Sequence, residues 1–212
     1  MGDYYATRYV DNPGRRKVWM AIVGYLVRFM DRDSSTVVDV GCGYGDFINN
    51  APGKRRIAVD LNPDSKKFLK EGIEFFCSPA TDLSFISSGS VDLVFTSNLL
   101  EHLTDSELDV TILEFRRILK AGGLLITMQP NFYYAYREYF DDYTHKKIFS
   151  HESLVDLFLA NGFGLIKMEK RFLPFSLKSK LPKSYWLTKL YLASFYRPFA
   201  KQMLGIFKNT GE

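Results

Sequence analysis

Two groups of residues in this chain have the types and the spacing to bind a ligand or transfer a proton. The first is the stretch DVGCGYGDF at positions 39–47, in which every second residue from Gly41 to Gly45 is glycine. Glycines let the backbone approach a ligand closely, because they lack a Cβ atom and tolerate positive φ. Asp39 precedes them, and Asp60 ends the next β-branched run, where a carboxylate can accept both hydroxyls of a ribose.

This glycine pattern differs from the patterns of phosphate-binding turns. A dinucleotide fingerprint needs a further glycine at the position of Asp46, and a P-loop needs a Lys-Ser/Thr pair, which does not follow these glycines. Carboxylates at Asp39 and Asp60 would repel a pyrophosphate. They suit a ligand that has a ribose and an amino group but no phosphate, and S-adenosylmethionine is such a ligand.

The second group contains two of the three histidines. His102 follows Glu101 in NLLEHL, and His145 ends DDYTH within the aromatic stretch 129–151. A histidine can take a proton from a hydroxyl acceptor when a carboxylate orients its ring. The predicted catalytic residues are therefore His102, His145 and Asp142, with Glu101 expected to orient His102, and Asp141 or Asp142 to orient His145.

Each member of the second group also has a purely structural interpretation. Glu101 and His102 could close a strand-to-helix turn without any chemical role. The aromatic stretch could be a packed loop whose acids pair with nearby cations, namely Arg137, Lys146 and Lys147. The residue types alone leave both interpretations open.

Strand-like and helix-like patterns alternate between positions 36 and 162. The predicted strands are 36–40, 57–60, 73–77, 90–97, 124–129, 163–172 and 203–208. Helices are predicted at Arg15–Asp31, from Asn62-Pro63, from Thr104 to a stop at Gly122-Gly123, from Ser150 to Gly162, and at 184–200. The alternation predicts an α/β protein with a mostly parallel sheet, helices on both faces and an antiparallel edge. Ligands of such sheets bind beyond the carboxyl ends of the strands, where both groups of residues should lie.

Four motifs in this order resemble those of the class I S-adenosylmethionine-dependent methyltransferases. They are VVDVGCGYGDF, AVDLNP, VDLVFTSNLLEHL and LKAGGLLIT. The resemblance is close over residues 36–130, and within this class the chain resembles the type 11 methyltransferases. It implies a Rossmann-like fold with a seven-stranded, mostly parallel sheet whose last strand is antiparallel, and S-adenosylmethionine as the cofactor.

The resemblance also implies which residues contact the cofactor. Asp39 would anchor the methionine amino group, Asp60 the ribose hydroxyls, and Leu61 would pack on the adenine. Pro79 stands where relatives often have an acid for the adenine amino group, so the Ala80 N–H with Thr81 or Asp82 would replace it. The full predicted set is Asp39, Gly41, Cys42, Gly43, Asp60, Leu61, Ala80, Thr81, Asn98 and Leu99, the last two beside the sulfonium.

Some relatives with the pattern E-x-x-E-H at the second group bind a divalent ion. In this chain Asn98 replaces the first acid, so only Glu101 and His102 match the pattern. An ion would need further ligands from Asp141, Asp142 or His145. We therefore expect no metal.

Composition and charge bear on location and partners. The chain has 212 residues with two cysteines, and we expect a cytoplasmic protein with one methyltransferase domain, made of a helical cap (1–33), a cofactor core (34–130) and an acceptor-side part (131–212). From Lys170 onward there are nine Lys or Arg residues, many aromatic residues and a single acid, Glu212. This basic segment could be a solvated helix, a lid over the acceptor, or a peripheral contact with a membrane.

The predicted function is methyl transfer to a small polar acceptor. SNLLEHL, PNFYYAYREYFDDYTH and RFLPFSLKSKLP resemble segments of bacterial methyltransferases of polysaccharide assembly, which implies a sugar or glycan hydroxyl. The alternatives are another small metabolite (a quinone-like ring or an amine) or a cofactor-binding module without turnover. Nucleic acid is not expected as a partner, because the N/D-P-P-Y/F motif is missing from the expected place. The protein is expected to be a monomer or a homodimer.

Overall fold

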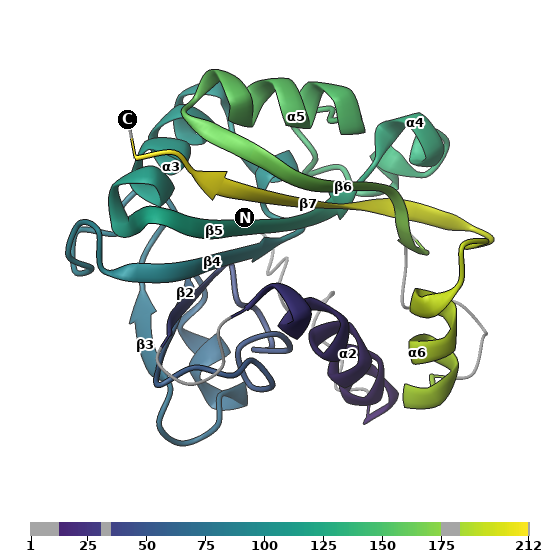
Figure 1. Ribbon diagram of the computed structural model, residues 1–212, viewed down its shortest axis with the longest axis horizontal. Helices are drawn as coiled ribbons and strands as arrows, with labels where there is room; N and C mark the ends of the chain where they lie inside the picture. The colour runs from purple at the N-terminus through teal and green to yellow at the C-terminus, as the bar shows by residue number, and fades with distance from the viewer. Residues whose placement is uncertain (1–12, 31–34, 175–182, 212) are drawn as a thin grey trace.

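In the computed structural model, one seven-stranded sheet forms the centre of the molecule (Figure 1). The structure describes residues 13–30, 35–174 and 183–211. The strand order is β3-β2-β1-β4-β5-β7-β6. β1 to β5 are mutually parallel, and β7 runs antiparallel to both β5 and β6. The predicted sheet, with its antiparallel last strand, is confirmed.

The elements follow the chain in the predicted alternation. The strands are β1 (Thr36–Val40), β2 (Arg55–Asp60), β3 (Glu74–Cys77), β4 (Val91–Ser97), β5 (Leu119–Pro130), β6 (Phe163–Pro174) and β7 (Ala200–Asn209). The helices are α2 (Pro13–Leu26), α3 (Asp105–Ile118), α4 (Phe132–Ala135), α5 (His151–Ala160) and α6 (Tyr185–Ala193). Short 3-10 helices are η1 (Val27–Phe29), η2 (Pro63–Phe68), η3 (Leu100–His102) and η4 (Tyr139–Asp141).

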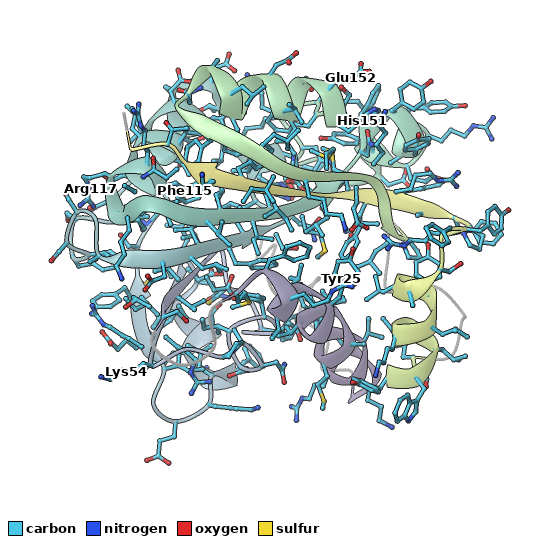
Figure 2. The ribbon with its side chains drawn as sticks, viewed as in Figure 1. Tyr25, Lys54, Phe115, Arg117, His151 and Glu152 are labelled. Atoms are coloured by element: carbon cyan, nitrogen blue, oxygen red, sulfur yellow. The ribbon has the colours of Figure 1, made fainter. Side chains whose placement is uncertain are left out.

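Helices cover both faces of the sheet, as predicted. Each face of the sheet carries its own cluster of buried apolar side chains. Because successive residues of a strand point to opposite faces, Val38 packs in the cluster under α3 and α5, whereas Val37 packs in the cluster under α2 and α6. Figure 2 marks Phe115 of α3, which is fully buried in the first cluster, and Tyr25 of α2. The Tyr25 ring contacts Phe172 of β6 and its hydroxyl donates to Glu169, which fastens α2 to the edge strand.

Several predicted boundaries need correction. The first helix ends at Leu26, and a 3-10 turn follows it; positions 31–34 lie outside the described residues. The element after Asn62-Pro63 is a six-residue 3-10 helix. Gly122 and Gly123 do not end a helix: α3 ends at Ile118, and the glycines lie in β5 at an irregularity in its pairing with β4. The last helix is shorter than predicted and the last strand is longer.

The five parallel strands end at a common edge of the sheet, and their following turns form that edge. Antiparallel β7 begins there, because Gln202 near its start pairs with Pro130 at the end of β5. A hollow lined by Phe29, Asp92 and Lys120 lies at the opposite, amino-terminal edge and contains none of the predicted site residues. Among the described residues, no helix is both long enough and apolar enough to cross a bilayer.

Candidate active site

The glycine turn after β1 is held by the end of β2. The N–H groups of Gly41 and Cys42 both donate to the carbonyl of Val59, at 2.9 and 3.1 Å. Gly41 and Gly43 have φ of 76° and 51°, in the left-handed region that favours glycine. A Cβ atom on Gly41 would lie 3.3 Å from the side chain of Leu99. The predicted residues Gly41 and Leu99 therefore lie together, at the ends of two neighbouring strands.

Asp60 joins the same turn from the end of β2. One carboxylate oxygen accepts the N–H of Gly43 at 2.7 Å and the other accepts the N–H of Asn62 at 2.8 Å. Each oxygen keeps a second lone pair, so the carboxylate can still accept hydroxyl groups from a ribose. Leu61 follows with 62% of its surface exposed and provides an apolar face beside Asp60.

Asp39 lies beneath the glycine turn. Its side chain is only 2% exposed, and the backbone N–H of Ile48 donates to it. Burial, together with the negative charges of Asp60 and Asp46, raises the pKa of this carboxyl group well above its usual range. A cationic amino group placed against Asp39 would offset this penalty, which fits the amino group of S-adenosylmethionine.

The other predicted cofactor residues are located by their burial and by the turns that contain them. The Cys42 thiol is buried in the apolar cluster under α2, so the backbone alone of this residue can face a ligand. The turn after β3 lies beside Asp60, since the N–H of Ser78 donates to the Asp60 carbonyl at 3.1 Å. Ala80 of this turn is buried and Thr81 is half-buried. Asp82 accepts the N–H of Ser84.

The first turn of α2 also reaches the glycine turn, which sequence reasoning missed. Arg15 forms an ion pair with Asp46, and its guanidinium group lies 4.6 Å from the centroid of the Tyr44 ring. Tyr44 in turn contacts the ring of Phe68 in η2 at 4.9 Å. Arg15 was visible in the sequence only as a cation at the start of a predicted helix. No local pattern links it to a turn 31 residues away.

The second group of residues gathers after β4. The carbonyl of Glu101 in η3 accepts the N–H groups of Lys146 and Lys147, at 2.8 and 3.0 Å, which joins this turn to the aromatic stretch. The rings of His102 and His145 are consequently 4.8 Å apart. His145 also packs on the buried ring of Tyr139, with 4.6 Å between the centroids. The structure thus unites two histidines that are 43 positions apart.

Thr144, which the sequence prediction did not single out, orients His102. Its hydroxyl lies 2.9 Å from Nδ1 of His102 and donates to Asp142 at 2.6 Å. Because the single hydroxyl proton points to the carboxylate, the hydroxyl oxygen accepts a hydrogen bond from the Nδ1–H group. The Thr144 carbonyl, 3.3 Å from Nδ1, can only accept as well. Both contacts place the ring proton on Nδ1, so the lone pair of the neutral ring is on Nε2.

The expected orienting role of Glu101 is wrong. Its side chain is fully buried, and neither carboxylate oxygen has a hydrogen-bond partner among the described residues. Burial, with a further contribution from the negative charge of Asp142, raises the pKa of Glu101 to about 8. The pairs suggested for the aromatic stretch also differ, since Lys146 and Lys147 pair with Glu107 and Asp105 of α3. Asp142 orients His102 through Thr144. The expectation that Asp141 or Asp142 orients His145 stays a prediction.

The same cluster contains ligand types that metals use. One atom each from Glu101, His102 and His145 lies within 4.8 Å of the others. Ligands of a single tetrahedral zinc ion, with bonds of about 2.0–2.1 Å, are about 3.3 Å apart. Asn98, which replaces the first acid of the metal-binding pattern, accepts from the Gln202 amide instead. Its φ of 50° is rare for a residue other than glycine. The expectation that no metal binds stays a prediction.

Comparisons with known proteins agree with this geometry. Residues 38–127 match the family model described as a methyltransferase domain. An uncharacterized protein of Methanocaldococcus jannaschii is 30% identical over 189 residues, which is 88% of this chain and 79% of that protein.

Two solved structures share the fold. A SAM-dependent methyltransferase from Archaeoglobus fulgidus has a TM-score of 0.70 at 21% identity, over 97% of this chain and 100% of that chain. A Haloferax volcanii putative methyltransferase, solved in complex with the Trm112 methyltransferase activator, has a TM-score of 0.68 at 19% identity, over 91% and 90% of the two chains.

The fold and the glycine turn define a Rossmann-like protein of the class I methyltransferase type. The chain carries a methyltransferase domain over residues 38–127 and is a methyltransferase that uses S-adenosylmethionine.

Proposed function

We propose that the chain transfers the methyl group of S-adenosylmethionine to a hydroxyl of a small polar acceptor, a sugar or a glycan, with His102 as general base. The observation that carries this proposal is the hydrogen-bonded series from Asp142 through Thr144 to Nδ1 of His102. It assigns the lone pair of the neutral ring to Nε2, as a general base requires. A hydroxyl is the acceptor that needs such a base, because it must lose its proton as it is methylated.

The bound cofactor supplies an activated methyl group, so the protein contributes mainly alignment and proton transfer. Nε2 of His102 would accept the hydroxyl proton while the acceptor oxygen bonds to the methyl carbon and the carbon–sulfur bond breaks. The products are the methyl ether and S-adenosylhomocysteine, with the proton on His102. The positive charge on that ring is stabilised by Asp142, through Thr144, and by Glu101 when it is ionised.

The aromatic stretch supports a sugar as the acceptor. Four of its rings are more than half exposed at the same edge of the sheet: Tyr133, Tyr136, Phe140 and Tyr143. The stretch is anchored at both ends, since the N–H of Phe132 donates to the carbonyl of Phe149 at 2.9 Å. Exposed rings beside fixed polar groups suit a ligand with apolar C–H faces and hydroxyl edges.

The test compares acceptor classes with the wild-type protein and with two histidine variants. Formation of S-adenosylhomocysteine is measured with nucleotide sugars, small glycans, quinone-like phenols and amines. His102→Gln is expected to lower kcat by about 10²- to 10⁴-fold, while calorimetry shows unchanged cofactor affinity. His151→Gln is the control: His151 is buried, whereas His102 is half-buried, and it lies at the start of α5 (Figure 2), where it contacts Asn131.

The outcomes separate the proposal from its alternatives. Turnover with sugars or glycans that depends on His102 supports it. Turnover confined to amines or phenols, or a His102→Gln variant as fast as wild type, would contradict it. Cofactor binding without turnover on any class would favour a binding module. A folded protein that does not bind the cofactor would contradict the family assignment itself.

A further inference from the structure

Helix α6 is apolar on both of its sides, although it lies at the surface of the molecule. Its inner side is accounted for, because Leu192 is buried in the cluster shared with α2. Its outer side carries Trp186 and Leu190, each 70% exposed, and Leu187, which is half exposed. Apart from Thr188 and Lys189 the helix is apolar, and an apolar helix is normally buried on all sides, so the outer side of α6 is suited to an apolar environment.

The turn that follows α6 enlarges this apolar surface. Phe195, Tyr196 and Phe199 are all largely exposed. Phe199 has a φ of 59°, which is rare for a bulky residue and persists only where the surrounding structure holds it. Two further bonds hold the turn: Tyr191 donates to the carbonyl of Pro198 at 3.0 Å, and Arg197 donates to that of Leu192 at 2.7 Å. Hydrogen bonds thus fix the conformation of the turn, and its aromatic side chains point toward solvent.

Helix α6 and the turn after it contain cations and no acid, although Glu169 of β6 pairs with Arg197 of the turn. No acidic residue occurs between Lys170 and Gly211, a span with nine Lys or Arg residues. Lys189 of α6 is exposed, and its ammonium group lies 5.3 Å from the ring centroid of Trp186. Helix α2, which packs beside α6 (Figure 1), has no acid either and exposes Lys17 and Met20. Apolar rings and cations therefore occur together on this part of the molecule.

We propose that the α6 surface (Trp186, Leu187, Lys189, Leu190, Phe195, Tyr196 and Phe199) docks on an anionic lipid bilayer. Tryptophan and tyrosine favour the headgroup region, leucine and phenylalanine the acyl boundary, and lysine the anionic headgroups. Docking of a second copy face to face would bring the lysines of the two copies together, which opposes association. A nucleic acid would meet the cations but would leave the leucines without apolar partners.

Docking at this surface would bring the active site close to the bilayer. The turn at 194–199 leads directly into β7, whose first residues lie at the carboxyl-terminal edge of the parallel strands. The aromatic stretch follows β5 at that edge. Among the described residues no helix spans a bilayer, so the contact would be peripheral. The inference does not depend on which acceptor is methylated.

The test is co-sedimentation of the full chain with phosphatidylcholine vesicles that do or do not contain phosphatidylglycerol. We expect binding to the anionic vesicles that weakens as salt is added. The double variant Trp186→Ser with Leu190→Ser should lose at least about 10-fold in binding. Its matched control, Leu113→Ser with Leu159→Ser, changes two exposed leucines on α3 and α5 and should bind like wild type.

A second measurement requires no variant. The chain has two tryptophans, of which Trp19 is 6% exposed and Trp186 is 70% exposed. Acrylamide quenching of the fluorescence therefore reports mainly on Trp186, and anionic vesicles should protect it. For the charges, Lys17→Glu with Lys189→Glu should weaken binding, whereas Lys66→Glu with Lys208→Glu should not.

Three results would overturn the inference. They are equal binding to neutral and anionic vesicles, equal losses for the two leucine-containing pairs, and unchanged quenching of Trp186 on vesicles. A dimer in light scattering that dissociates on Trp186→Ser with Leu190→Ser would identify the α6 surface as a contact between copies. Protection of Trp186 by single-stranded nucleic acid but not by vesicles would identify a nucleic-acid surface.

Discussion

Asp141 and Asp142 are adjacent carboxylates with different surroundings, which allows a test of the proposed base. Asp142 accepts from the Thr144 hydroxyl and so reaches His102, whereas Asp141 ends the 3-10 helix η4. Asp142→Ala should lower kcat by about 10- to 100-fold, the cost of one hydrogen bond to a charged group. Cofactor affinity should not change, because Asp142 does not belong to the glycine turn.

The control is Asp141→Ala, which should keep at least half of wild-type kcat. Thr144→Ser retains the hydroxyl and should also retain activity, whereas Thr144→Val should resemble Asp142→Ala. Single-turnover rates and calorimetry of the cofactor measure the two quantities separately. If both aspartate variants were impaired equally, the loop as a whole, and not the hydrogen-bonded series, would determine the rate.

Glu101 makes the stability of the protein depend on pH in a definite direction. Its pKa is raised to about 8 by burial, whereas an exposed glutamate titrates near 4.5. Between these values the folded chain keeps a proton that the unfolded chain has lost, so the free energy of unfolding falls as pH rises. The stabilisation by protonated Glu101 is fully present below the pKa that Glu101 has in the unfolded chain. It is lost as pH rises through the pKa of Glu101 in the folded chain. Because a tenfold change in proton affinity corresponds to about 1.4 kcal/mol, the total is on the order of a few kcal/mol.

The measurement is urea denaturation of wild type and Glu101→Gln from about pH 5 to about pH 9. We expect the difference between the two proteins to change steadily in favour of the variant as pH rises. Asp39, whose pKa is also raised, contributes equally to both proteins and cancels in the difference. A pH-independent difference would show that Glu101 is ionised in the folded protein at neutral pH.

At the scale of elements, the glycine turn requires glycine at position 45 for two reasons: its positive φ, and the lack of room for a Cβ atom. Gly45 has a φ of 65°, and a Cβ atom there would lie 2.5 Å from Leu69 and 2.9 Å from Asn49. Gly45→Ala should therefore lower the free energy of unfolding by about 2–4 kcal/mol, because backbone strain and overlap both act. Cofactor affinity should fall with it, since the same turn carries the predicted cofactor residues Gly41 and Gly43.

The matched control is Gly89→Ala, because Gly89 has a φ of 60° and no atom within 4 Å of a Cβ. It should lose about 1 kcal/mol from backbone strain alone. Chemical denaturation gives both values, and the difference between the variants measures the overlap. Equal losses would mean that Leu69 and Asn49 move aside at little cost.

The elements themselves were largely predictable, because hydrophobic period and capping are local. Thr104 with Glu107 forms the predicted capping box at the start of α3. Gly122 and Gly123 led to a wrong prediction of a helix end. Glycine often ends a helix, but it also permits an irregularity within a strand, and only the pairing of β5 with β4 distinguishes the two cases. The glycine turn and Asp60 could be placed at one edge for a similar reason, since each directly follows a strand.

The contacts that cross the chain could not be predicted. Thr144 orients His102 from 42 positions away, and Arg15 reaches Asp46 from the first helix. Glu101 was expected to orient its sequence neighbour, yet adjacent residues of a 3-10 helix point about 120° apart. Neighbours in a sequence are therefore poor candidates for partners, whereas turns that follow neighbouring strands are good ones.

For the molecule as a whole, cofactor binding should stabilise the fold, because the predicted site joins four separate segments around the glycine turn. A ligand at 100 times its Kd adds about 2.7 kcal/mol to the free energy of unfolding. For a chain of this size, that corresponds to a rise in Tm of about 5–11 °C. Asp60→Ala should remove between about a third and nine tenths of this rise, because loss of its hydrogen bonds weakens binding by about 1–3 kcal/mol.

The quantity to compare is the rise in Tm that the cofactor causes, and not Tm itself. Asp60 also accepts the N–H groups of Gly43 and Asn62, so its loss destabilises the free protein too. Asp64→Ala is the control: Asp64 lies four residues on, is exposed, and its carboxylate forms a surface ion pair with Lys67. A full rise in Tm with cofactor in Asp60→Ala would remove Asp60 from the site, while a reduced rise in both variants would point to a general effect of negative charge at this edge.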